Sequence, residues 1–244
     1  MVTITATDEL KHISTASVGV TYTRDRTWPR RYSVKWCCVS QPTHVVQIVD
    51  GRWTATPDGF RTVSMGYDRL FAVGDLAWTD FEVTIPITAH ATDERASHNP
   101  VSGSPGIGFL VHWRGHSFDE TPECECSQPR CSAPPTGPLI WYDFALRQFE
   151  MQGALDAPGV TRAIEMNTPY VWKVRSETVP QVHRYYYRMK VWKLGEPEPG
   201  QWDIEGFGPK NRSSSGSILF DAHHADATFG DISVVPGPFN DAAK

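Results

Sequence analysis

A strict alternation of apolar and polar residues over positions 80–90 (DFEVTIPITAH) limits most strongly what this chain can fold into. The apolar positions are Phe81, Val83, Ile85, Ile87 and Ala89. Successive side chains of a β-strand point to opposite faces, so this pattern predicts a long strand with one buried face. A strand of this kind needs a second layer over its apolar side. Pro86 has no N–H group to donate, so we expect it at a bulge, an edge or an unpaired position.

Short alternating segments separated by turn residues recur along the rest of the chain. Asp50-Gly51 marks a tight turn, and 19 Gly and 19 Pro favour many turns and few long helices. We count about a dozen strands without alternating helices, which predicts an all-β sandwich. All 244 residues are expected to form one such domain, because β-sandwiches reach this length. Residues 1–30, which are Thr-rich, are expected to form an N-terminal arm or an edge strand.

Composition argues against several partners and leaves the location open. The net charge of −5 argues against nucleic acid and anionic membranes, which attract basic proteins. No apolar run approaches the roughly 20 residues of a membrane span. The first 14 residues, MVTITATDELKHIS, contain neither the basic nor the apolar region of a signal peptide. The expected location is therefore either the cytoplasm or, after removal of a leader, an extracellular or periplasmic setting; the oligomeric state is not predicted.

The order of several segments carries a family resemblance. The segments are GRW (51–53) with DGF (58–60), WTDFEV (78–83), GIGF (106–109), YRMKVW (187–192) with EPGQW (198–202), and ADATFGDISV (225–234). In this order they resemble the concanavalin A-like lectin/glucanase superfamily, and within it the laminin-G-like and 3-keto-glycoside-hydrolase-like domains of bacteria. The likeness covers roughly residues 45–236. It implies a jelly-roll sandwich of two curved antiparallel sheets, with glycans often bound on the concave sheet.

We therefore expect a carbohydrate-binding, lectin-like protein in a bacterial-type extracellular setting, which recognises a poly- or oligosaccharide on its concave sheet. The alternative is a lyase or glycoside hydrolase that acts on polysaccharide with non-standard catalytic residues. The resemblance implies a strand of the form Glu-x-Asp-x-(x)-Glu in glucanases, and the chain has no such strand. Whether it is an enzyme stays open, and a structural or adhesion module is a third reading.

Parity along three predicted strands selects five candidate ligand-binding residues. His112 and Arg114 lie opposite Val111 and Trp113 in their strand, so they are expected on the open face if the latter are core. Trp141 and Asp143 share a face with each other, and Glu150 lies on the following strand. Aromatic rings and a few polar anchors are typical of concave binding sites. The five predicted site residues, facing one shared groove, are His112, Arg114, Trp141, Asp143 and Glu150.

A structural calcium ion is implied by the resemblance rather than by the residue pattern. Asp231 resembles the acid near the last strand that supports a calcium ion in several superfamily members. Asp50, from the early turn, is its natural partner. Calcium takes several oxygen ligands, many of them backbone carbonyls that a sequence does not reveal. The alternative for Asp231 is a carboxylate that stabilises a turn.

Cysteines and paired histidines complete the candidate list. Residues 115–137 are expected to be the longest irregular segment and hold three of the five Cys. Cys124 or Cys126 is expected to pair with Cys131 in an oxidising compartment, and the odd count leaves at least one thiol unpaired within the chain. His223 and His224 are adjacent and would face opposite ways on a strand, which favours packed histidines over a shared metal.

Overall fold

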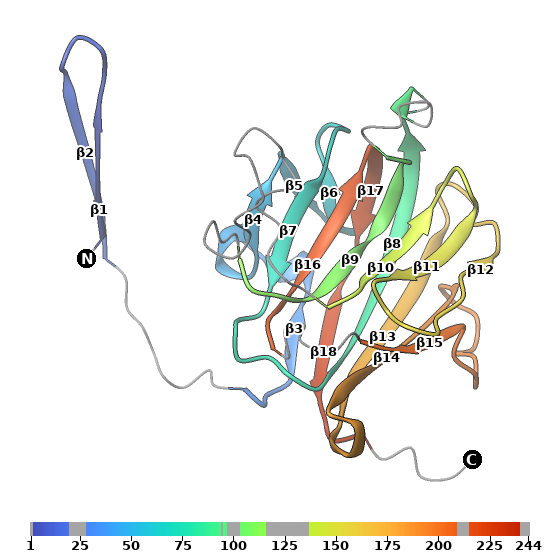
Figure 1. Ribbon diagram of the computed structural model, residues 1–244. Helices are drawn as coiled ribbons and strands as arrows, with labels where there is room; N and C mark the ends of the chain where they lie inside the picture. Colours follow the sequence, from blue (N-terminus) through green and yellow to red (C-terminus); the bar gives the residue numbers. More distant parts are fainter. Residues whose placement is uncertain are drawn as a thin grey trace.

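The computed structural model describes residues 2–19, 28–93, 95–96, 103–115, 137–208 and 215–239. Within these ranges there are two large antiparallel sheets, a separate two-stranded sheet and no α-helix (Figure 1). Short 3-10 helices occur at Trp36–Cys38, Pro42–His44 and Pro180–Val182. The predicted all-β sandwich is therefore confirmed. No helix in the described part of the chain is long and apolar enough to cross a membrane.

The first sheet has seven strands, and all its neighbours are antiparallel. In spatial order they are β12 (Val160–Thr161), β11 (Gln148–Gln152), β10 (Leu139–Asp143), β9 (Gly106–Trp113), β16 (Ser217–His223), β7 (Arg69–Val73) and β4 (Gln47–Asp50). The consecutive strands β9, β16 and β7 come from distant parts of the sequence, so long-range pairing builds this part of the sheet (Figure 1).

The second sheet has nine strands and lies behind the first in Figure 1. Its main path is β15 (Ile204–Phe207), β14 (Arg184–Lys193), β13 (Pro169–Val179), β8 (Phe81–Thr92), β17 (Ala225–Phe229), β6 (Gly59–Thr62) and β5 (Trp53–Thr56). Two further strands, β18 (Ile232–Pro236) and β3 (Tyr32–Val34), pair with each other, and β18 also pairs with β8. Strand β8 therefore has β13 along one edge and both β17 and β18 along the other.

Strand β8 has the alternation that its sequence predicts. Phe81, Val83, Ile85 and Ile87 are at most 1% exposed, whereas the intervening residues are half-buried on the outer face. Pro86 lies where β17 ends and β18 has not yet begun, so its missing N–H leaves no ladder bond unmade. The chain crosses this gap at Gly230, whose N–H donates to the carbonyl of Pro86 at 2.7 Å. Of the bulge, edge or unpaired position expected for Pro86, the structure shows a position unpaired on the β17/β18 side only, since Pro86 pairs with Val171 on the β13 side.

The core between the two sheets is rich in aromatic residues. Its largest fully buried side chains include Trp172, Tyr142, Tyr187, Phe60, Phe71, Phe81, Phe109, Phe149, Phe220 and Phe229. Phe71 stacks on Phe220 with ring centroids 4.8 Å apart, which joins adjacent strands β7 and β16 on the inner face. Burial of this much apolar area is the main stabilisation of the sandwich. Residues that alternate with these core positions therefore form the two outer faces.

The N-terminal residues form a hairpin of β1 (Val2–Thr7) and β2 (Ile13–Val18). This hairpin pairs with no other strand in the described ranges. The chain joins the sandwich at Trp28, whose ring lies 5.0 Å from that of Trp78. Strand β3 then adds to the nine-stranded sheet beside β18.

The cysteines fall into two groups. Cys37 and Cys38 are exposed and free, and they lie in a short 3-10 helix with their Sγ atoms 3.0 Å apart. The predicted pairing of Cys124 or Cys126 with Cys131 lies outside the described residues. The same is true of the greater part of the long irregular segment expected at residues 115–137.

Candidate functional site

One row of directly paired residues crosses the outer face of the seven-stranded sheet. From β11 to β4 the row is Glu150, Trp141, Gly108, Asp221, Leu70 and Asp50. Directly opposite residues on neighbouring strands have Cβ atoms about 4.5–5.5 Å apart, so these side chains are neighbours. The row combines an indole ring, carboxyl groups and a glycine on one face, which is the composition of a polar binding site with an aromatic wall.

Two glycines on β9 make room for the indole of Trp141. A Cβ atom at Gly106 would lie 1.9 Å from Cζ2 of Trp141, so the ring lies over this glycine. A Cβ atom at Gly108 would lie 1.9 Å from the carbonyl oxygen of Ile140. Larger residues at either position would displace the ring or separate the strands. Gly108 also leaves no side chain between Trp141 and Asp221 in the row.

The alternation of β16 directs Asp221 to the outer face. Ile218, Phe220 and Ala222 are fully buried in the main core, so the residues between them point the other way. Leu219 accordingly belongs to a second apolar cluster on the outer face. The prediction from sequence missed Asp221. A single acid in the centre of an apolar strand (SILFDAH) is a signal that could have identified it.

Asp221 is a buried carboxyl group with an incomplete set of hydrogen bonds. The residue is 6% exposed, and its Oδ1 atom has no hydrogen-bond partner among the residues that the structure describes. Burial, followed by the charges of Asp68 and Asp50, raises the pKa of Asp221 well above its usual range. The neutral carboxyl group is therefore favoured in the folded protein, and a neutral carboxyl both donates and accepts hydrogen bonds. An unpartnered group of this kind costs stability unless a ligand satisfies it.

A histidine–aspartate pair lies beside this row. His223 Nδ1 and Asp68 Oδ1 are 2.6 Å apart, and the His223 ring lies 6.2 Å from that of Trp141. The rings of His223 and His224 meet edge to face at 4.5 Å, and both ring nitrogens of His224 are buried without a partner. Burial, followed by the charge of His223, lowers the pKa of His224. No group of three or more His, Cys, Asp or Glu in the described ranges is arranged to hold a metal ion.

The structure places three of the five predicted site residues together. Trp141 and Glu150 are paired in the row, and Asp143 lies on the same face of β10. Trp141 and Asp143 are buried, at 6% and 7% exposure. Asp143 accepts a hydrogen bond from the Leu146 N–H at 2.9 Å, and this bond holds the β10–β11 turn. Glu150 accepts one from Gln152 Nε2 at 2.6 Å and is half-buried.

The open-face prediction for His112 is wrong. His112 has φ 57°, and the β9–β16 register shifts between Ser217 and Leu219, as at a β-bulge. The extra residue moves the alternation by one, so His112 turns into the core and Trp113 turns outward. Inside the sandwich His112 Nε2 lies 3.2 Å from Ser176 Oγ, and Nδ1 lies 3.3 Å from the hydroxyl of Tyr187. Trp113, which the parity argument assumed to lie in the core, is buried instead in the apolar cluster on the outer face.

Arg114 lies at the opposite end of the same outer face. It is exposed and lines an open groove of about 1590 Å³. The groove lies where the ends of β9 and β7 and the start of β16 meet residues of the 28–48 segment. Trp113 and Ala72 belong both to its lining and to the apolar cluster on the outer face. Arg114 is therefore separated from Trp141, since β9 begins at Gly106 beside Asp143 and ends at Trp113.

The two predicted calcium ligands do not form a joint site. Asp50 belongs to the seven-stranded sheet and lies 3.3 Å from Arg69 Nη1. Asp231 lies between two strands of the nine-stranded sheet, where it accepts hydrogen bonds from Lys35 Nζ at 2.9 Å and the Trp36 N–H at 3.0 Å. Each carboxylate has a cationic partner of its own. Asp231 therefore acts as a tie for the 35–36 segment, and this pair of residues does not fit a calcium ion.

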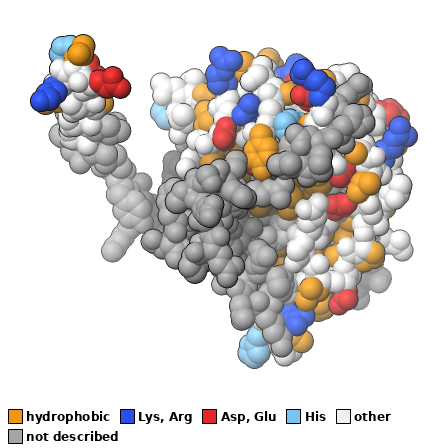
Figure 2. All heavy atoms as spheres, turned by 45° about the horizontal axis from the view of Figure 1, so that its top comes forward, with side chains coloured by type: hydrophobic (Ala, Val, Ile, Leu, Met, Phe, Trp, Pro, Cys, Tyr) orange, Lys and Arg blue, Asp and Glu red, His pale blue; other side chains and the backbone are white. Residues whose placement is uncertain are grey.

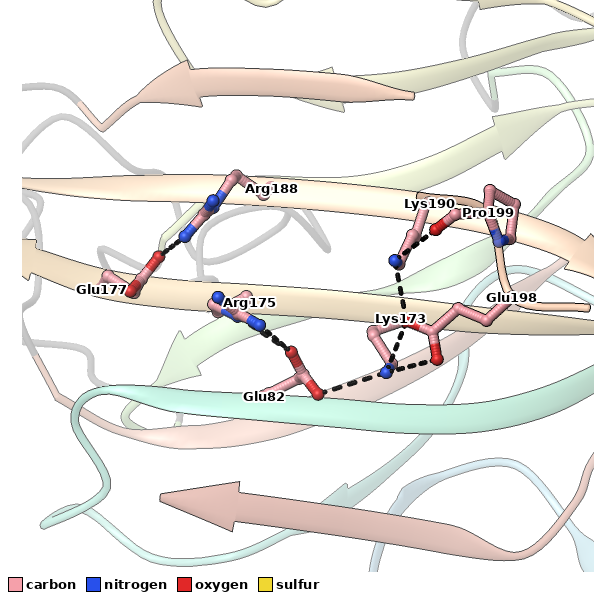
Figure 3. A network of polar contacts seen from close by, with 8 residues as sticks. All are labelled: Glu82, Lys173, Arg175, Glu177, Arg188, Lys190, Glu198 and Pro199. Atoms are coloured by element: carbon pink, nitrogen blue, oxygen red, sulfur yellow. Dashed lines mark hydrogen bonds and ion pairs between the residues drawn. The ribbon is translucent and has the colours of Figure 1, made fainter. Parts of the chain in front are cut away.

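The outer face of the nine-stranded sheet carries charges that are paired with one another (Figure 3). Glu82 lies between Arg175 and Lys173, at 2.7 and 3.4 Å. Glu198 lies between Lys173 and Lys190, at 2.8 and 2.7 Å, and Arg188 pairs with Glu177. Figure 2 shows the molecule from another side, with the upper end of Figure 1 turned forward. Acidic, basic and histidine side chains are interspersed over the described surface in that view.

Trp202 covers the cations of this network. Its ring lies 5.1 Å from the guanidinium of Arg175, 5.2 Å from that of Arg188 and 4.8 Å from Lys190 Nζ. Burial would raise the pKa of Glu198, but hydrogen bonds from the two lysines outweigh burial and lower it. These contacts leave the network little capacity for an external ligand, so we place the candidate site on the seven-stranded sheet.

Comparisons with known proteins identify the fold. No protein-family model and no curated protein sequence matches the chain. Three solved structures are similar over most of their length. A protein of unknown function with a galectin-like fold from Bacillus subtilis has a TM-score of 0.52 at 13% identity, over 84% of this chain and 94% of that one. The metal-free exoplasmic/lumenal domain of VIP36 has a TM-score of 0.50 at 10% identity, over 86% and 93%.

The third similar structure is peanut lectin in complex with a nine-residue peptide. Its TM-score is 0.50 at 8% identity, over 84% of this chain and 96% of that one. At these identities the likeness establishes architecture alone. Together with the two antiparallel sheets, it shows that the chain has the same β-sandwich fold as these structures, the fold that the resemblance to the concanavalin A-like superfamily predicted.

Proposed function

We propose that this protein binds a carbohydrate on the outer face of its seven-stranded sheet. One observation carries the proposal: the unpartnered, buried carboxyl group of Asp221 lies in one cross-strand row with the indole of Trp141, with only Gly108 between them. The apolar face of a sugar ring stacks on an indole, and its hydroxyl groups need donors and acceptors. A neutral Asp221 supplies both.

The other outer face supports this choice by contrast. Its lysines, arginines and glutamates satisfy one another, so a sugar would have to break existing ion pairs to bind there. On the seven-stranded sheet a sugar hydroxyl would instead satisfy a carboxyl oxygen that has no partner. A ligand gains most where it removes an existing desolvation cost.

A glycan array followed by calorimetry on its hits tests the proposal. Trp141→Ala and Asp221→Ala should each weaken binding by about 1–3 kcal/mol, because each removes a buried contact to the sugar. Asp221→Asn should retain part of the affinity, since an amide also donates and accepts. Two variants serve as matched controls: Asp58→Ala, an exposed turn residue, and Trp202→Ala, on the other outer face. Binding unchanged by both site variants, or no binding to any glycan, would contradict the proposal.

Polysaccharide cleavage is a second candidate function, favoured by one specific observation. A general acid needs a pKa above that of an ordinary carboxyl group, and burial raises the pKa of Asp221 in that direction beside the His223–Asp68 pair. Asp221→Asn separates the two functions, because an amide cannot transfer a proton. An enzyme would release reducing ends or unsaturated sugars, and this variant would abolish release while sugar binding persisted. A binding protein would release no product with either form.

A further inference from the structure

We infer that the groove at the far end of the same face binds acidic groups of the saccharide, so that the ligand is an acidic oligosaccharide carrying carboxylate or sulfate groups. This inference rests on the proposed function and deepens it. The occupant follows from the charge, the size and the position of the groove.

The groove is built from aromatic side chains of both the sheet and the N-terminal segment. Trp113 contributes from the end of β9, and Trp28 and Tyr32 contribute from the segment that enters the sandwich. Trp78 packs between them, with its ring 5.0 Å from that of Trp28 and 5.5 Å from that of Tyr32. The volume of about 1590 Å³ exceeds the roughly 300–1,000 Å³ of pockets for small ligands. A chain of several sugar units suits this size better than a single sugar.

The charge of the groove is opposite to that of the whole protein. Arg30, Arg31 and Arg114 line it together with His44, against the single carboxylate of Asp75. Asp75 Oδ1 already accepts a hydrogen bond from the Ala77 N–H at 2.7 Å. The chain as a whole has 28 acidic and 23 basic residues, so Arg31 and Arg114 beside one acid are a local excess of positive charge among the described lining residues. Guanidinium groups bind carboxylate and sulfate oxygens through two parallel hydrogen bonds.

Two of the groove's arginines, Arg31 and Arg114, have no carboxylate partner among the described residues, unlike several arginines elsewhere in the sandwich. Arg61, Arg162 and Arg175 are each paired with a carboxylate at 2.6–2.9 Å. Among the residues that the structure describes, Arg31 and Arg114 form no ion pair, and both are exposed. They are therefore available to an anion that arrives from solution.

The groove and the Asp221 row lie on the same outer face of the seven-stranded sheet. Ser217 lines the groove and Asp221 lies four residues further along β16, which corresponds to roughly 13 Å of strand. Between them lies Leu219, paired with Leu110 and Ala72 in the apolar cluster. The groove and the row are therefore neighbouring parts of one outer face, separated by this buried apolar cluster.

Calorimetry with three probes tests the inference: an oligogalacturonate, a sulfated oligosaccharide and a neutral cello-oligosaccharide of matched length. We expect at least one acidic probe to bind about tenfold or more tightly than the neutral one, and salt to weaken its binding. The tighter acidic probe identifies carboxylate or sulfate as the recognised group. Arg31→Ala/Arg114→Ala should reduce the affinity for the acidic probe roughly tenfold. Arg52→Ala, an exposed arginine outside the groove, is the matched control and should change nothing.

The outcomes separate this inference from the proposed function. The acidic ligand is ruled out if the neutral and acidic probes bind with equal affinity, or if the double variant binds the acidic probe like wild type. If Asp221→Ala still weakens binding in that case, the proposed function stands. Binding that depends on the arginines but not on Asp221 or Trp141 supports the acidic groove and contradicts the proposed site. No binding of any of the three probes overturns the acidic ligand, whereas the glycan array decides the proposed function. Thermal unfolding of each variant confirms that it is folded before binding is measured.

Discussion

The two outer faces of the sandwich use polar residues in opposite ways. On the nine-stranded sheet one row reads Glu82, Arg175, Arg188 and Glu205, so acids flank two bases in register. On the seven-stranded sheet the corresponding row has Asp221 next to a glycine and an apolar residue, with one carboxyl oxygen unpartnered. The charged groups on the nine-stranded sheet are paired with one another, whereas the carboxyl group of Asp221 on the seven-stranded sheet can still accept or donate a hydrogen bond.

This difference indicates which face is structural and which is functional. Arg175 and Arg188 are directly opposite and would repel each other, but Glu82, Glu177 and the ring of Trp202 compensate. Nothing of this kind compensates Asp221. Buried polar groups without a hydrogen-bond partner occur mainly at functional sites, where a ligand supplies the missing contact. The comparison therefore predicts that variants on the two faces affect stability and binding in different proportions.

The core beneath both faces should give the largest effect on stability. Ile85→Ala removes a fully buried side chain from the centre of β8 and leaves a cavity. We expect the free energy of unfolding to fall by about 2–5 kcal/mol. Chemical denaturation with urea measures this loss. A change below about 1 kcal/mol would mean that β8 is not the centre of the packed core.

Removal of one acid from the paired face should have the next largest effect. Glu82→Gln leaves Arg175 and Lys173, both largely buried, without their shared carboxylate. The expected loss is about 1–3 kcal/mol, since a partly buried charge loses its partner. Glu196→Gln, at an exposed position, is the control and should stay within about 0.5 kcal/mol. If both variants lost the same small amount of stability, the ion-pair network would contribute nothing measurable to folding. The proposed difference between the two outer faces would then be wrong.

On the outer face of the seven-stranded sheet, removal of an acid should stabilise the protein instead, by an amount that depends on pH. Because the pKa of Asp221 is raised, the folded state keeps a proton that the unfolded state releases above an aspartate pKa of about 3.9. Wild-type stability should therefore fall, relative to Asp221→Asn, as pH rises from that value to the folded pKa. The slope of the difference reaches at most about 1.4 kcal/mol per pH unit for one proton.

Urea denaturation of both proteins between pH 4 and pH 8 measures this difference, because titration of all other groups cancels in it. Asp58→Asn, in an exposed turn, controls for the loss of one carboxylate. A stability difference that is constant with pH, or that grows in favour of the wild type, would show that Asp221 is ionised in the folded protein.

The arginines of the groove should give the smallest effect on stability. Arg31→Ala and Arg114→Ala should each change the free energy of unfolding by less than about 0.5 kcal/mol, because both side chains are exposed and form no ion pair in the described part of the chain. Differential scanning calorimetry is sensitive enough to detect a larger change. A loss comparable with that of Glu82→Gln would assign these arginines a structural role instead.

Local alternation was enough to predict the strands and much of their orientation. The pattern at residues 80–90 identified β8 and its buried face. Trp141, Asp143 and Glu150 were also expected on shared faces, and the structure places all three on one outer face. His112 shows the limit of this reasoning. A single residue in the left-handed region of backbone conformation changed which residues of β9 face inward. Local composition does not predict such a bulge.

The sequence by itself determined the class of fold, because burial of alternating side chains is a property of each strand separately. The tertiary structure alone decided which strands are neighbours. Asp221 and Trp141 lie on strands far apart in the chain, and they meet only because β9 inserts its glycines between β16 and β10. Strand order follows from the packing of the whole core, to which every strand contributes similar apolar residues. No short segment specifies its partner, so the site became visible only after the sheet was assembled.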